Sequence, residues 1–296
     1  MKQKVALVGP GRVGCSITRH LFLAGYPVSA VIGRDREKTL DACAFIGCPA
    51  KCASINLADI RDAQVILIAA PDDQIRPLAD KIQQQRQTFT SITMIHFSGL
   101  HPADIMRQPS SETTLLSLHP LLPFANRQSA FEQLKNCPCV LEGDKAALPL
   151  GEKIVKALGG QSFQINGQKK ALYHTAACIA SNFFVTLYGW ACELLEAADI
   201  DKAQASALLT PLVQATLNNV TTYGPEQGLT GPIVRADVGT VSRHLAELKK
   251  ISLQDHSSYL NLAELTLSLA EKSGRLDRQS AKQLHSVLSH KPEEPK

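Results

Sequence analysis

The sequence lacks any long run of charge of one sign and is poor in aromatic residues. Lysine and arginine outnumber aspartate and glutamate by only 31 to 27, and aromatic residues make up 5% of the 296 positions. A protein that binds nucleic acid usually carries a basic tract, so nucleic acid is not an expected partner. The final residues, HKPEEPK, are mixed in sign and rich in proline, which is typical of a frayed tail.

The eight cysteines lack the spacing of a zinc site. Cys43, Cys48 and Cys52 form one group, and Cys137 and Cys139 flank a proline, but no two CxxC pairs are present. We therefore expect reduced thiols in a cytoplasmic protein and no bound metal.

Signal-peptide and membrane-span patterns are also missing or interrupted. Glycine and proline break the short apolar run in KVALVGPG, which argues against a signal peptide. Residues 171–192 carry no formal charge and are long enough to span a bilayer. They include His174 and Asn182, however, and a buried helix at the centre of a bundle explains the same pattern. We expect a soluble protein without a membrane partner.

The first half of the chain alternates short apolar runs with helical periodicity. Helices are predicted at 12–23 and about 37–45. The run VILIAA is typical of a strand that is buried on both faces of a parallel sheet. Strands are predicted at 3–8, 28–32, 65–70, 93–97, 115–118, 139–141 and 162–165. This alternation predicts an α/β fold, a doubly wound and mostly parallel Rossmann-type sheet over 1–166.

Near residue 166 the alternation of strand-like and helical segments ends, and the rest of the chain predicts an all-α domain. Long amphipathic segments begin at about 168, 202, 237, 256 and 277, with almost no alternating strand pattern between them. The hydrophobic fraction of 44% is enough for a sizeable core, and the length fits two domains. We expect a helical domain over 167–290 and a disordered tail at 291–296.

A glycine-rich loop opens the chain directly after the first predicted strand. It reads Gly9-Pro10-Gly11-Arg12-Val13-Gly14 and leads into a predicted helix, which is the context of a dinucleotide fingerprint. Gly9 permits the tight turn, Gly11 lets a pyrophosphate approach the backbone, and Gly14 lets helix and strand pack closely. The helix N-terminus then offers free N–H groups to the anion. We expect Ala70 and Pro71, which follow the strand at 65–70, to contact the same cofactor.

The end of the second strand indicates which nicotinamide cofactor is bound. An NAD-binding domain normally carries an acidic residue there, which binds the ribose hydroxyls. This sequence has Gly33 at that place and Arg34 next, a pair that suits the 2′-phosphate of NADP(H). Arg12 could add a second positive charge. In the alternative, Arg34 is a solvated turn residue and Asp35 binds the ribose.

Three further stretches resemble a known family: HFSGL with SLHPLLPF, then KKALYHTAACIASNF, then GPEQGLTGPIVRADVGTVSRHL. Together with the glycine loop, they resemble the Rossmann-like NADP oxidoreductases with a C-terminal domain of unknown function 2520. That family is similar to the 6-phosphogluconate, 3-hydroxyisobutyrate and prephenate dehydrogenases and to pyrroline-5-carboxylate reductase. The resemblance implies an NADP-dependent oxidoreductase and a homodimer that forms through the helical domain, but no particular substrate.

Ser98 and His119 each lie at the end of a predicted strand. Because ligands bind beyond the carboxyl ends of parallel strands, both are predicted to lie near the nicotinamide and to bind substrate. Prephenate dehydrogenases carry a similar histidine-proline after the corresponding strand. A capping or packing role for His119 is the alternative.

The helix that begins near residue 168 supplies the other candidates. At about 100° per residue, Lys170, His174 and Ser181 share one stripe, and Asn182 lies on its flank. Hydroxyacid dehydrogenases of the superfamily that the sequence resembles carry a lysine and an asparagine four residues apart here, whereas this chain has Lys170 and His174. Histidine is a credible proton donor near neutral pH. The alternative for His174 is a satisfied core histidine.

Arg235 follows a Gly-Pro break in the helical domain. It could hold a substrate carboxylate or phosphate, or it could pair with Asp237 and be structural.

The sequence as a whole predicts hydride transfer between NADP(H) and a small carbonyl, imine or hydroxyacid-type substrate. His174 is predicted to be the acid or base and Lys170 to polarise the reacting bond, while Ser98, His119, Ser181 and Asn182 hold the substrate. The alternative function is a non-catalytic regulator that senses NADP(H) and signals through its helical half.

Overall fold

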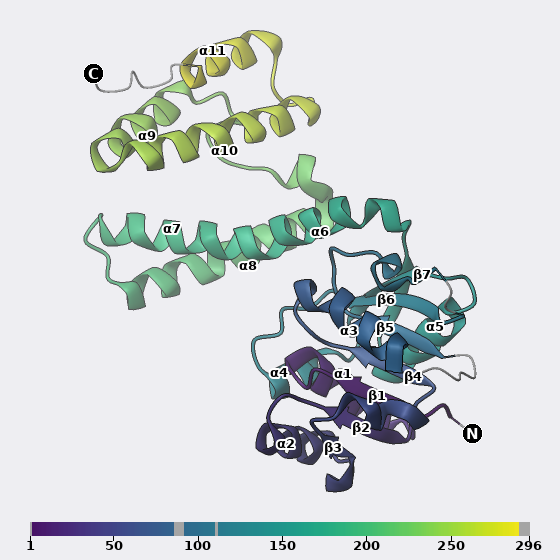
Figure 1. The fold of residues 1–296 in the computed structure, drawn as a ribbon. Helices are drawn as coiled ribbons and strands as arrows, with labels where there is room; N and C mark the ends of the chain where they lie inside the picture. Colours follow the sequence, from purple (N-terminus) through teal and green to yellow (C-terminus); the bar gives the residue numbers. More distant parts are fainter. Residues whose placement is uncertain (1, 86–91, 110–111, 290–296) are drawn as a thin grey trace, which may run out of the picture. The chain divides into compact units, whose positions relative to one another are not determined.

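The computed structural model describes residues 2–85, 92–109 and 112–289, and they divide into two compact units. The first unit is Met1–Leu187 and the second is Tyr188–Lys296 (Figure 1). The boundary lies later than the one expected at 166–167, because the start of the long helix is tied to the sheet by a buried side chain. The predicted tail at 291–296 lies outside the described residues.

An eight-stranded sheet forms the centre of the first unit, in the order β3-β2-β1-β4-β5-β6-β7-β8. All neighbouring strands are parallel except β6 and β7, which confirms the predicted α/β class with a mostly parallel sheet. The strands are β1 (Val5–Val8), β2 (Val28–Ile32), β3 (Ala53–Ser54), β4 (Val65–Ile68), β5 (Thr93–His96), β6 (Thr114–Pro120), β7 (Pro138–Gly143) and β8 (Gln161–Gln164). The two-residue β3 has no counterpart among the predicted strands, because two residues are too few to show a period.

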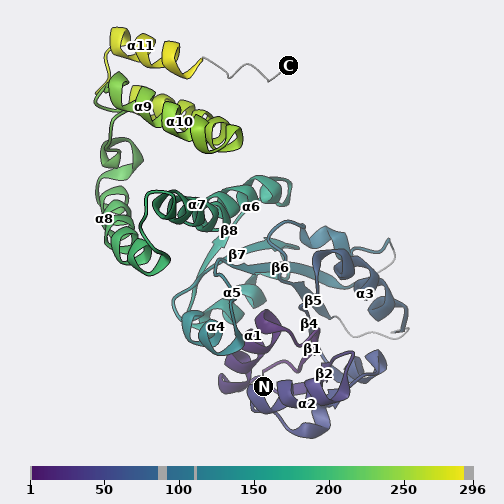
Figure 2. The ribbon, with the colours of Figure 1, turned by 90° about the vertical axis from the view of Figure 1, so that its left-hand side faces the viewer.

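Helices cover both faces of this sheet (Figure 2). Alternate residues of β1 enter different clusters: Val5 and Leu7 pack on one face, and Ala6 and Val8 on the other. The helices of the first face are α1 (Arg12–Leu23), α2 (Arg36–Ile46), α4 (Arg127–Gln133) and α5 (Leu148–Leu158). The second face is covered by α3 (Asp72–Gln85), η2 (Leu57–Asp62) and η3 (Ala103–Met106).

The long helix after the sheet is continuous but not uniform. It comprises η4 (Gly167–Lys169), α6 (Lys170–Cys178), a π-helical turn η5 (Ile179–Phe183) and α7 (Phe184–Glu196). Among the described residues, Gly167–Glu196 is the stretch long and apolar enough to cross a membrane, and none of its most apolar window is buried. This differs from the expectation of a buried helix at the centre of a bundle.

The second unit is helical, as predicted. α8 (Lys202–Gly228) bends at Gly224, where the backbone leaves the helical region. α9 (Val238–Ile251), α10 (Leu253–Lys272) and α11 (Arg278–Leu288) pack side by side around Val241, Leu267 and Leu284 (Figure 1). α8 contributes little to this core, because most of its side chains are exposed.

Candidate functional site

The glycine loop after β1 has the geometry that a bound pyrophosphate requires. Gly9 has φ +87°, and a Cβ there would run into the main-chain carbonyl of Ala69 at the end of β4. A Cβ on Gly14 would lie 2.7 Å from that of Ala69, so helix α1 and the sheet approach closely. A Cβ on Gly11, by contrast, would meet only open space. The loop is thus closed against β4 and open above Gly11, where a ligand would approach.

Helix α1 begins above this opening without a side-chain cap. Its N-cap is Gly11, and no acidic residue lies in its first turn. The first N–H groups of the helix are therefore available to an anion. Arg12 stands beside them, and its Nη1 donates to the carbonyl oxygen of Phe124 at 3.1 Å.

The end of β2 carries Gly33 and Arg34, and the carboxylate that follows them, that of Asp35, caps a helix. A Cβ on Gly33 would collide with Thr39 Oγ1, so no side chain fits there. Asp35 is engaged as the N-cap of α2, where its carboxylate accepts a hydrogen bond from the N–H of Lys38 at 3.0 Å. Arg34 is exposed between them.

One cavity of about 450 Å³ adjoins the glycine loop. It reaches from the start of α1 across the ends of β4 and β5 to α6. Its lining residues are Gly11, Arg12, Val13, Ala69, Ala70, Asp72, Phe97, Ser98, Gly99, Phe124 and His174. The structure therefore brings the predicted phosphate loop together with Ser98 and His174.

Ser98 lines this cavity, but its hydroxyl is already used by the protein. It accepts hydrogen bonds from the N–H groups of Leu100 (3.1 Å) and His101 (3.0 Å). Its own proton goes to Asp72 Oδ2, 3.0 Å away. Ser98 thus fixes a turn and the carboxylate of Asp72.

Lys170 lies beneath the cavity rather than in its wall. Its side chain is 1% exposed, and Nζ donates to the carbonyl oxygen of Ser98 at 2.8 Å and to Ser117 Oγ. Burial lowers the pKa of Lys170 to about 8, against the smaller opposing effects of Glu142 and Asp72. The ammonium group therefore ties α6 to the ends of β5 and β6.

Two histidines converge on Gly99 from different elements. A Cβ on Gly99 would lie 2.5 Å from His174 Cδ2 and 2.9 Å from His119 Nε2. The two rings lie edge to face, with centroids 6.1 Å apart. His119 Nδ1 is 2.7 Å from the hydroxyl of Tyr173, and His174 Nδ1 is 3.7 Å from Cys178 Sγ. Burial, and then the charges of Lys170 and His174, lower the pKa of His119 to about 4, so His119 is neutral at pH 7.

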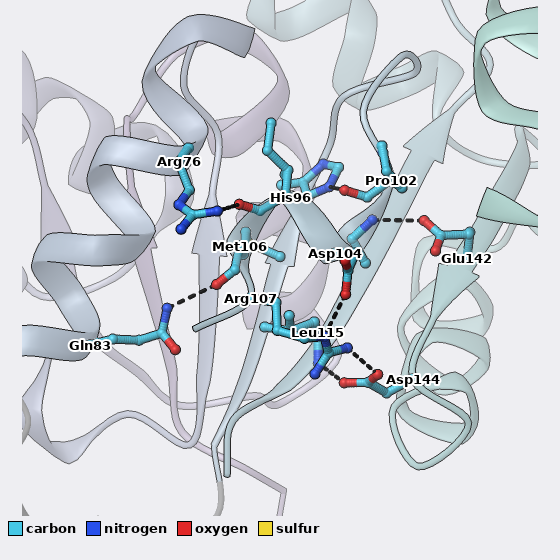
Figure 3. A network of polar contacts seen from close by, with 12 residues as sticks. Arg76, Gln83, His96, Pro102, Asp104, Met106, Arg107, Leu115, Glu142 and Asp144 are labelled. Atoms are coloured by element: carbon cyan, nitrogen blue, oxygen red, sulfur yellow. Dashed lines mark hydrogen bonds and ion pairs between the residues drawn. The ribbon is translucent and has the colours of Figure 1, made fainter. Parts of the chain in front are cut away.

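The segment after β5 is anchored by polar contacts on its far side (Figure 3). His96 Nε2 is 3.2 Å from the carbonyl oxygen of Pro102, and Glu142 accepts from the N–H of Ala103 at 2.8 Å. Arg107 pairs with both Asp104 and Asp144. These contacts hold the whole turn in place, and with it the Ser98–Gly99 backbone at the cavity.

Ser181 and Asn182 are not among the residues that line the cavity. Ser181 and Asn182 are exposed in the π-helical turn, where the uniform 100° step assumed for the stripe does not hold. Arg235 is exposed in the second unit, just before α9, whose N-cap is Asp237. Their roles as substrate contacts stay predictions. Within the described residues, no group of three or more histidine, cysteine or acidic side chains could hold a metal ion.

Asp72, Gly99, Ser117 and Tyr173 belong to the site but were not among the predicted residues. Asp72 comes directly after Ala70-Pro71, so the strand-end rule that selected Ser98 would have found it too. Tyr173 and Ser117 carry no such signal, because only the packing of α6 on β6 brings them to His119 and Lys170.

Comparison with known proteins supports the fold. No curated protein matches the sequence significantly. A protein from Bacteroides fragilis, named a "putative NADP oxidoreductase", has 19% identity and a TM-score of 0.72 over 90% of this chain and 98% of that chain. A protein from Thermotoga maritima has 24% identity and a TM-score of 0.72 over 91% and 99%. A Plasmodium falciparum pyrroline carboxylate reductase, solved with NADP bound, has 12% identity and a TM-score of 0.57 over 92% and 98%.

These identities are low, and the likeness to the solved structures shows a shared fold. The sequence match to a family is independent of that likeness. Residues 137–286, about half of the chain, match the family described as a domain of unknown function, DUF2520. The match contains β7, β8, the long helix with Lys170 and His174, and most of the second unit. The chain belongs to the DUF2520 family.

Proposed function

We propose that this protein is an NADP-dependent oxidoreductase that transfers a hydride between the nicotinamide and a small carbonyl, imine or hydroxyacid-type substrate. The observation that carries the proposal is that one cavity is lined both by the glycine loop and by His174. A dinucleotide that is held by the loop would bring its nicotinamide toward the ends of β4 and β5. The imidazole of His174 lies in the wall at that end of the cavity.

The residues at the loop fit a dinucleotide phosphate. Gly9, Gly11 and Gly14 would let the pyrophosphate reach the free N–H groups of α1, and Ala70 and Pro71 would flank it. Arg34 would hold the 2′-phosphate, because Gly33 admits no side chain and Asp35 is engaged as a helix cap. When bound, the cofactor would supply the hydride or accept it.

The side chains around Gly99 have separable roles. His174 lines the cavity and would donate or accept the proton of the reacting group. His119, held by Tyr173, would stay neutral and limit the movement of the His174 ring. Lys170 is buried outside the cavity, which favours a positioning role under Ser98 over direct polarisation of the substrate.

Two measurements on the full-length protein test this function. Fluorescence titration should show saturable binding of NADPH, and NADPH should then be consumed in the presence of a mixed panel of small aldehydes, ketones, imines and oxoacids. Absence of NADPH binding overturns the proposal. Tight binding without turnover across the panel would instead favour the regulator that senses NADP(H).

A further inference from the structure

The cavity wall contains one negatively charged side chain, that of Asp72. The other charged side chain in the wall is Arg12, whose guanidinium is directed to the carbonyl of Phe124. Lys170 is close but buried behind Ser98, so it does not face a ligand in the cavity. Asp72 is therefore the fixed charge that a substrate would meet beside His174.

The carboxylate of Asp72 is held in one orientation. The Ser98 hydroxyl has both of its acceptor positions filled by main-chain N–H groups, so its proton is committed to Asp72 Oδ2. Within the described residues no other hydrogen bond to Asp72 is present, which leaves Oδ1 for a ligand. Asp72 also begins α3, so it lies at the positive end of that helix.

We propose that Asp72 is the counter-ion for a positively charged nitrogen in the substrate, so that the site takes an iminium ion or, in reverse, a protonated amine. This inference rests on the proposed function and narrows its substrate class. A carboxylate binds such a cation through a charge-assisted hydrogen bond. The same carboxylate opposes the negative charge that develops on oxygen when a neutral carbonyl is reduced. Asp72 therefore favours a cationic iminium substrate over a neutral carbonyl substrate.

The reduction of an iminium balances without any further reactant. The hydride of NADPH forms the new C–H bond, the C=N π pair becomes the lone pair of the nitrogen, and NADPH is oxidised to NADP⁺. The neutral amine then takes a proton from His174, which solvent replaces.

Asp73 provides a matched control for Asp72. It is also an aspartate in the first turn of α3, but its carboxylate accepts a hydrogen bond from Gln74 Nε2 at 2.8 Å and does not line the cavity. Neutralising Asp73 changes the net charge of the protein and the helix N-terminus as neutralising Asp72 does.

The test uses dead-end complexes of the full-length protein saturated with NADPH, so no natural substrate is needed. Isothermal titration calorimetry would compare piperidinium, a cyclic amine charged at neutral pH, with cyclohexanol, a neutral alcohol of the same ring size. We expect piperidinium to bind at least about tenfold more tightly. Asp72→Asn should remove this preference, Ser98→Ala should weaken it, and Asp73→Asn should keep it.

The outcomes separate this inference from the proposed function. If the wild-type protein does not bind NADPH, the proposed function itself fails. If NADPH binds but neither probe does, or both bind equally, the counter-ion role is overturned while the oxidoreductase proposal stands. The same holds if Asp72→Asn alters only the NADPH affinity, or if Asp73→Asn loses the preference equally. Melting temperatures of all variants would confirm that they are folded.

Discussion

Lys170 Nζ donates a hydrogen bond to the main-chain carbonyl oxygen of Ser98, 2.8 Å away. The lysine begins α6 and the serine follows β5, so this bond joins the long helix to the cavity wall. The second bond, to Ser117 Oγ, extends the link to β6. A buried ammonium group thus sets the position of the helix that carries His174.

We expect Lys170 to make stability depend on pH above neutrality. Burial lowers its pKa from 10.5 to about 8, so between these values the unfolded chain binds a proton that the folded chain does not. The free energy of unfolding should therefore rise with pH from about 8 to 10.5, by up to about 3 kcal/mol from this group. Lys170→Met should lack that rise.

Urea denaturation of both proteins at pH 7 and pH 10.5 measures this effect. The contribution of Lys170 is the change in the free energy of unfolding of the wild-type protein minus that of the variant. The cysteines and tyrosines titrate in both proteins, so their contribution cancels. An identical pH dependence in the two proteins would contradict the assignment.

His174→Ala should lower turnover at least about tenfold, since general acid catalysis typically contributes about 10²–10⁴-fold. The affinity for NADPH should stay within about threefold, because the phosphate loop and Arg34 are untouched. Thr175→Ala is the control: Thr175 is exposed and bonds only its own helix, at Ala171. A variant that loses stability and NADPH binding together would show a packing role for His174 instead.

Gly99→Ala tests whether the two histidines must meet at this residue. The added methyl group would lie 2.5 Å from His174 Cδ2 and 2.9 Å from His119 Nε2, so both rings must move. Displacement by about 1 Å can lower a rate about 10²-fold, and we expect a loss of that order. Gly239→Ala, where the nearest atom would be 3.7 Å away, should leave turnover unchanged. Full activity in Gly99→Ala would contradict the claim that turnover depends on the positions of the two histidine rings.

Arg34→Ala should weaken NADPH binding by about 1–3 kcal/mol and leave NADH binding nearly unchanged. The physical reason is that only NADPH carries the 2′-phosphate that Arg34 would contact. Fluorescence titration with both cofactors gives the ratio, and Arg243→Ala in α9 serves as a charge-matched control. An unchanged ratio would remove Arg34 from the phosphate site.

We propose that a second copy of the chain covers the exposed apolar side chains of the long helix α6–α7 and those of α8. Leu172, Val185, Leu212 and Leu217 are each 60% or more exposed, which is unusual for large apolar side chains in a stable monomer. Light scattering in detergent-free buffer should give a dimer mass. Leu212→Glu should shift it to a monomer, whereas Leu265→Glu, at an equally exposed leucine on α10, should not. A monomer mass for the wild-type protein at micromolar concentration would refute the dimer.

The sequence alone determined the elements whose signal is local. The glycine spacing, the strand before it and the helix after it predicted a phosphate loop, and the structure gives Gly9, Gly11 and Gly14 the geometry expected of them. The fully buried VILI of β4 predicted a parallel sheet, and the loss of alternation near 166 predicted the helical half. Each of these signals lies in residues that are contiguous along the chain.

Only the tertiary structure decided what each polar side chain does. Ser98 and Lys170 are 72 residues apart in sequence, and their hydrogen bond arises from the packing of α6 against the strand ends. That contact buries the lysine, which the sequence had placed against the substrate. Likewise, the lack of charge at residues 171–192 marked this helix as apolar, but it indicates only that the helix must be covered. What covers it depends on contacts beyond the segment, and none of its most apolar window is buried in the single chain.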